Sequence, residues 1–227
     1  GLNYNHLFLN DEFSPEPRLA LEWKFDGNKS LTFGFGRHSQ RQAEALYLVE
    51  IEKNQGMKEP VNRNLGFNKA NHYVLTYNHI LTKDVRLKMD LYYQALSNIP
   101  IPKDTTDNDF LKSYSTINDV SWFTFVPLEN KGTGENYGIE CTLEKFFNQG
   151  WYAMLTGALY ESKYTAKDGI QRNNRFNGNY MANFVGGKEF TFKNNVIGFN
   201  IKYSHLGGKH YTPVKEVKIE TNGQGEP

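Results

Sequence analysis

The stretch that decides the fold is Val85-Arg86-Leu87-Lys88-Met89-Asp90-Leu91-Tyr92-Tyr93-Gln94-Ala95, in which apolar and polar residues alternate with one exception, Tyr92. Successive side chains of a β-strand point to opposite faces of the sheet, so this alternation predicts a strand with one apolar and one charged face. On a helix the same residues would scatter charge around the whole circumference.

The same period of two recurs elsewhere. Apolar residues alternate with polar ones at 19–25, 137–144 and 197–204, and more weakly at 180–189. With their flanks these segments predict eight strands, preceded by the tail of another strand before Leu7. The predicted ranges are 18–25, 31–36, 72–81, 85–96, 136–147, 151–164, 179–192 and 196–206.

The connections between these strands alternate in length. Tight-turn residues join the strands in pairs, at 26–29, 82–84, 148–150 and 193–195, whereas the links at 38–71, 97–135 and 166–178 are long. Alternate connections of an up-and-down meander lie at the same end of the sheet. The pattern therefore predicts one end with tight turns and one with long loops, as in outer-membrane β-barrels.

Strand length agrees with that interpretation. A strand of ~11 residues, tilted by ~40°, covers roughly 28 Å, which is the thickness of the hydrocarbon layer. Aromatic residues gather near the predicted strand ends, where a lipid-facing barrel places its interfacial girdles. A soluble sandwich, whose core also suits aromatic residues, is the alternative.

The amino-acid composition argues against several other classes of protein. The chain has 227 residues, a net charge of +1, one Cys and 15% aromatic residues, and its mean hydropathy is −0.66. Near-neutral charge gives no support for a nucleic-acid partner. A single Cys can form neither an internal disulfide nor a Cys-based metal site. A polar mean hydropathy combined with many aromatic residues fits strands whose successive side chains face two different environments.

Several blocks along the chain resemble the barrel of TonB-dependent outer-membrane receptors. The likeness is to the subgroup that carries a carboxypeptidase-regulatory-like domain ahead of its plug. The blocks lie at 16–21, 30–40, 136–147, 155–164, 175–180, 186–190 and 207–213, and include Asn136-Tyr137-Gly138-Ile139-Glu140 and Gly186-Gly187-Lys188-Glu189-Phe190.

This resemblance implies a 22-stranded barrel in the bacterial outer membrane that imports a scarce nutrient, such as a siderophore or a glycan. Its implied partners are the TonB–ExbB–ExbD complex, the nutrient and the membrane lipid. We expect residues 1–227 to be part of such a barrel, about eight strands without the signal peptide, the plug or the closing C-terminal strand. Neither enzyme activity nor a cofactor or metal is expected.

The alternation also predicts which side chains face the lumen. These are the polar residues between the apolar positions of three strands, namely Arg86, Lys88, Asp90, Gln94, Glu140, Thr142, Glu144, Asn200 and Lys202. In the long link at 97–135, the aromatic residues Trp122, Phe123 and Phe125 are candidates for ligand contact in an external loop. The alternative is that this loop folds back on the barrel rim or the plug.

Two other functions stay open on sequence. The chain could form a small self-contained outer-membrane barrel, as an adhesin or an enzyme, or a soluble β-sandwich that binds a ligand. No Ser/His/Asp or Cys/His arrangement for nucleophilic catalysis stands out. Cys141 lies at an apolar position of its strand, where a thiol behaves as a small hydrophobic group.

Overall fold

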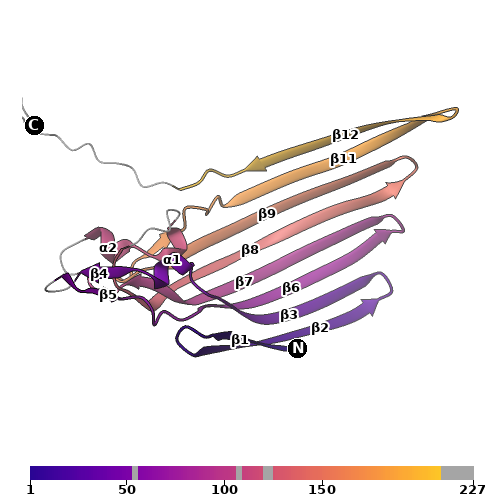
Figure 1. The fold of residues 1–227 in the computed structure, drawn as a ribbon. Coiled ribbons are helices and arrows are strands. Elements are labelled where there is room, and N and C mark those ends of the chain that lie inside the picture. Colours follow the sequence, from indigo (N-terminus) through magenta and orange to yellow (C-terminus); the bar gives the residue numbers. More distant parts are fainter. Residues whose placement is uncertain (53–55, 106–108, 120–124, 211–227) are drawn as a thin grey trace, which may run out of the picture.

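The computed structural model describes residues 1–52, 56–105, 109–119 and 125–210. It is all-β, with 69% strand and 6% helix. Figure 1 shows one broad antiparallel sheet in a single layer, with the small helices gathered at one end. Nine strands run in the order β1-β2-β3-β6-β7-β8-β9-β11-β12, the short β10 pairs with β9, and β4 and β5 form a separate hairpin. The predicted antiparallel up-and-down meander is confirmed.

The long strands match the predicted ranges and extend beyond them, mainly toward the long loops. The preceding strand that the sequence predicted is β1, Leu2–Leu7. The others are β2 Glu12–Asp26, β3 Lys29–Gln40, β6 Asn68–Thr82, β7 Val85–Pro102, β8 Leu128–Asn148, β9 Trp151–Thr165, β11 Tyr180–Phe192 and β12 Asn195–Leu206.

Two-residue turns close all four predicted hairpins, and we call this edge the turn end. In the β8–β9 turn, Gln149 (φ 55°) and Gly150 (φ 74°) both adopt the left-handed conformation. Two such residues build the hairpin turn whose twist matches that of the strands. The opposite edge is the loop end, and it departs from the predicted pattern at one place, because only residues 8–11 join β1 to β2 there.

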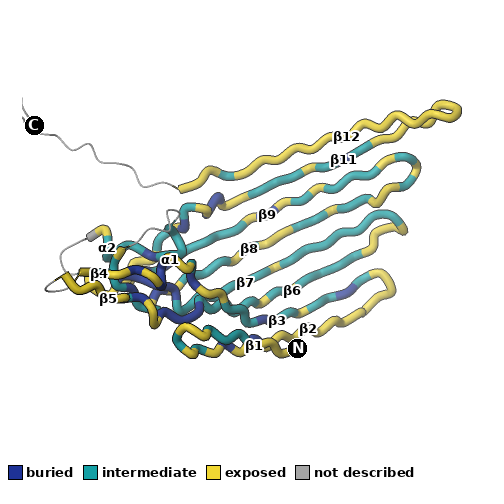
Figure 2. Tube along the Cα trace, viewed as in Figure 1, coloured by how far each residue is buried: buried dark blue, intermediate teal, exposed yellow. Residues whose placement is uncertain are grey.

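The long links fold together at the loop end. They contain α1 Glu44–Tyr47, β4 Glu50–Glu52, β5 Lys58–Pro60, α2 Asp109–Ser113, the 3₁₀ turn η2 Thr116–Asn118 and β10 Gln171–Asn173. Leu46, Tyr47, Leu65 and Leu128 form a small core there. Figure 2 shows that buried residues concentrate in this region, while most of the sheet stays partly or fully exposed.

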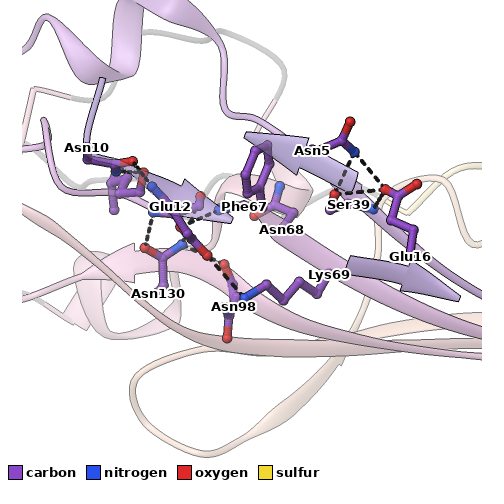
Figure 3. A network of polar contacts seen from close by, with 12 residues as sticks. Asn5, Asn10, Glu12, Glu16, Ser39, Phe67, Asn68, Lys69, Asn98 and Asn130 are labelled. Atoms are coloured by element: carbon purple, nitrogen blue, oxygen red, sulfur yellow. Dashed lines mark hydrogen bonds and ion pairs between the residues drawn. The ribbon is translucent and has the colours of Figure 1, made fainter. Parts of the chain in front are cut away.

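Buried side chains take over hydrogen bonding where the strand ladders stop. β2 pairs with β3 only from Arg18 onward, and its first six residues pair with β1. The Glu16 carboxylate accepts the Ser39 backbone N–H at 2.7 Å and the Asn5 amide at 2.8 Å, so it joins β1, β2 and β3 (Figure 3). Nearby, Glu12 accepts the Phe67 backbone N–H at 3.1 Å.

Register aligns the apolar residues of neighbouring strands into continuous rows. Residues directly opposite in an antiparallel pair point to the same face. One row runs through Leu21, Phe33, Leu75, Leu91, Ile139, Leu159 and Tyr180, from β2 to β11. We call this side the apolar face. Its side chains are exposed, with Leu91 at 57% and Leu159 at 63%, and no second sheet of the described chain covers them.

The same row measures how far the strands are staggered. It crosses β2 at Leu21, five residues before the strand ends at Asp26, and β11 at Tyr180, twelve residues before Phe192. The row thus drifts by seven residues over six strand-to-strand steps. At ~3.4 Å per residue and ~4.8 Å between strands, this drift corresponds to strands tilted by about 40° from the perpendicular to the turn end.

Replacing Asn62 tests the loop-end structure. Asn62 is buried, donates to the Val126 carbonyl at 3.1 Å and accepts the Leu128 backbone N–H at 2.8 Å. Because Asn62→Ala leaves both backbone groups unsatisfied, we expect it to destabilise this region by about 1–3 kcal/mol. Hydrogen exchange at the Leu128 amide should accelerate. Asn28→Ala, in an exposed turn, is the control; equal exchange in both variants would contradict the assignment.

Candidate functional site

The face opposite the apolar face carries the polar residues, and we call it the polar face. The structure places all nine predicted lumen-facing residues on it. Arg86 lies opposite Glu144, Asp90 opposite Glu140, and Gln94 opposite Asn136. Continuing across β9 and β11, the Arg86 row reaches Lys202 in β12. That this face borders a lumen stays a prediction.

Ion pairs lie in the turn-end half of the polar face. Arg86 Nη2 lies 2.7 Å from Glu144 Oε2, and Lys88 Nζ lies 2.7 Å from Asp90 Oδ2. The Thr76 hydroxyl donates to Asp90 at 2.5 Å. These pairs join β6, β7 and β8, and they leave little net charge on this part of the face.

Toward the loop end the polar face becomes uncharged. His38 and His72 lie in edge-to-face contact, with 4.8 Å between ring centroids. The His72 ring contacts the Gln94 side-chain amide, and Gln94 in turn accepts a hydrogen bond from Asn136. Imidazoles and amides thus form one row of contacts across β3, β6, β7 and β8, which is hydrogen-bonded from His72 to Asn136. Such groups can both donate and accept hydrogen bonds.

A hollow of about 680 Å³ opens over this row, between the sheet and the folded loops. Its lining includes the four residues of the row together with Ser162 and the exposed ring of Phe176. The one lining ammonium group, Lys69, is paired with Glu12 at 3.1 Å. A second hollow of similar volume adjoins it and shares Gln40, Asn68, Ile117 and Phe176. Together they form a polar cleft that is nearly neutral.

Sequence reasoning identified part of this cleft and missed the rest. Gln94 was assigned from alternation, and Asn136 and His72 stand at polar-face positions that the same alternation would have given. His38 lies beyond the predicted strand end, because β3 continues to Gln40. Phe176 comes from a long link, and no local pattern places it over the sheet. The cleft depends on how the links fold back.

The predicted loop contact is only partly covered by the structure. Trp122 and Phe123 lie outside the described residues. Phe125 is exposed, and its neighbour Val126 packs against the loop-end core. Ligand contact by these three aromatic residues stays a prediction.

The lining of the cleft consists mainly of hydrogen-bonding groups and apolar side chains. Within the described ranges, no three His, Cys, Asp or Glu side chains are grouped so that they could hold a metal ion. None of the helices in those ranges combines the length and apolar content needed to cross a membrane. The lining groups can hold a polar molecule by several hydrogen bonds, with Phe176 available for stacking.

Comparison with known proteins does not assign the chain to a family. A search of protein-family models finds no match, and no curated protein matches it.

A double-mutant cycle on Arg86 and Glu144 tests whether water reaches the polar face. Because the Arg86 side chain is 43% exposed, solvent should screen the pair, and we expect a coupling energy of about 0.2–1 kcal/mol. Arg86→Gln, Glu144→Gln and the double variant would be compared by chemical unfolding. A coupling above ~2 kcal/mol would mean that this face is closed to water.

Proposed function

We propose that this chain forms part of the wall of a TonB-dependent outer-membrane receptor, which imports a scarce nutrient such as a siderophore or a glycan. Lipid would cover the apolar face, and the polar face would line the transport path. The observation that carries the proposal is the exposed, in-register apolar face, which crosses seven strands and has no protein layer over it in the described structure. A soluble sheet would bury that face.

The dimensions of the sheet support a membrane position. The tilt of about 40° lies within the range of transmembrane barrels. Tyr73, Tyr93, Tyr137 and Tyr180 lie on the apolar face about ten residues from the turn end of their own strands. At that tilt they stand roughly 26 Å from the turns, close to the height of an outer-membrane apolar band. Trp23, Phe25, Trp151, Phe190 and Phe192 provide aromatic residues near the turns.

The two edges of the sheet favour a larger barrel. β1 and β12 each pair with one neighbour among the described residues. Unpaired strand edges are not tolerated in lipid, so each edge needs a further strand. Additional strands of a 22-stranded wall would satisfy both edges. Direct pairing of β1 with β12 would instead give the small self-contained barrel.

The cleft then has a place in transport. By the barrel asymmetry, the loop end would face the cell exterior and the turn end the periplasm. The neutral cleft would lie on the inner surface below the loops, where an entering nutrient first meets the wall. The TonB–ExbB–ExbD complex would supply energy through the plug of the complete protein.

Site-directed spin labels test which face meets lipid. In the complete protein, with Cys141 replaced by Ser, labels at Leu91 and Leu159 should collide with oxygen and be shielded from a water-soluble nickel relaxant. Labels at Lys88 and Thr142 should show the opposite. We expect this contrast in outer-membrane vesicles because the two pairs occupy opposite faces of the neighbouring strands β7, β8 and β9.

Two outcomes would reject the proposal. If all four labels are equally accessible to the nickel relaxant, the sheet is not in a membrane. If Lys88 and Thr142 contact lipid while Leu91 and Leu159 do not, the assignment of the faces is inverted. Loss of nutrient uptake in cells lacking the energy-supplying complex, with binding retained, would separately establish TonB dependence.

A further inference from the structure

A second recess lies on the sheet far from the polar cleft. It has a volume of about 450 Å³ and lies where β9, β11 and β12 run side by side near the turn end. Four large side chains of the apolar face line it, those of Trp151, Phe184, Phe199 and Ile201. Since the proposed function places this face in lipid, the recess would open to the bilayer; the inference below rests on that position.

Small residues make the recess. Ala153 of β9 pairs with Gly186 of β11, and Gly186 pairs with Ile201 of β12. A side chain at Gly186 would meet the Phe184 ring, since its Cβ would lie 3.0 Å from Phe184 Cζ. The Phe184 ring therefore lies over Gly186, and the floor of the recess consists of the Ala153 methyl group and this ring, between taller neighbours. The result is an apolar furrow.

A cation stands at the turn end of the furrow. Lys188 is paired in register with both Trp151 and Phe199, so it belongs to the apolar face. Its Nζ donates to the Gln149 carbonyl at 3.0 Å, and no carboxylate of the described chain lies within ion-pair distance of it. The adjacent Glu189 points to the opposite face. Lys188 thus carries an uncompensated charge beside an apolar furrow.

The neighbouring lysine provides a contrast. Lys145 Nζ lies 3.0 Å from Asp84 and 4.3 Å above the Trp151 ring. Hydrogen bonds from Lys145 and Thr82 hold the pKa of Asp84 at about 2, so the carboxylate neutralises Lys145 at physiological pH. Lys145 is therefore occupied within the protein, and Lys188 is the cation left to bind a ligand here.

We propose that this furrow is a binding site for an anionic glycerophospholipid, with one acyl chain along Ala153 and the Phe184 ring and the phosphate at Lys188. An apolar furrow that ends in a cation and a tryptophan complements such a lipid at both ends. Lysine at a membrane surface attracts anionic headgroups, and its apolar stem can lie in the acyl region. Tryptophan prefers the same interfacial level.

Native mass spectrometry can test the site in the complete protein. The protein would be reconstituted in nanodiscs with equal amounts of phosphatidylglycerol and phosphatidylcholine of identical acyl chains, and the lipids retained after release would be counted. We expect phosphatidylglycerol to be retained about fivefold over phosphatidylcholine. Lys188→Gln should abolish the preference and Lys188→Arg should keep it. Lys202→Gln, the same charge change on the polar face of the same hairpin, should also keep it.

A second variant tests the acyl part of the site. Ala153→Leu would fill the furrow without altering charge, and we expect retention of both lipids to fall. No preference in the wild type, or an equal loss with Lys202→Gln, would overturn the lipid site. The spin labels at Leu91 and Leu159 test independently whether the sheet is in a membrane. Failure of the lipid site can therefore be told apart from failure of the proposed function.

Discussion

The whole structure depends on the register of antiparallel pairing. Each ladder sets residues directly opposite one another, and opposite residues share a face. Register shifts lie near the turns and in the loop-end part of the β7–β8 ladder. Because pairing stays in step between them from β2 to β11, the period-two pattern of single strands becomes one apolar and one polar surface. A slip of one residue in any ladder would move a strand's apolar side chains to the polar face. The same register fixes the stagger, and hence the tilt of about 40°.

Where the backbone hydrogen-bond ladders end, hydrogen bonds from side chains hold the chain segments together. Glu16 bonds the Ser39 backbone where β2 leaves β3. From the folded links, buried Asn62 accepts the Leu128 backbone N–H at the start of β8, and buried Asn177 accepts the Ser162 backbone N–H in β9. These contacts hold three links, far apart in the sequence, over one end of the polar face. The cleft is the space that remains between them and the sheet. Its nearly neutral lining follows from pairing of the charged groups within the wall.

The two faces of the sheet differ in how their charged side chains are compensated. On the polar face, charged groups pair with each other, as Arg86 does with Glu144. On the apolar face, Lys145 is neutralised by Asp84, whereas no carboxylate among the described residues lies within ion-pair distance of Lys188, beside the furrow. An unpaired cation in such a setting has to find its counter-charge outside the chain. This difference separates a lysine that stabilises a turn from one that can bind lipid.

Sequence alone determined the strands, the tight turns and the side of the sheet on which residues such as Arg86 and Glu140 lie. The alternation of apolar and polar residues is a local pattern, and the sequence of each strand contains all of it. Tertiary structure decided what local patterns cannot encode. Folding of the links brought Phe176 over His72, and β1 turned back on β2 through residues 8–11. The pairing of Ala153 with Gly186 formed the furrow, because it depends on the register between strands that are separated by a long link.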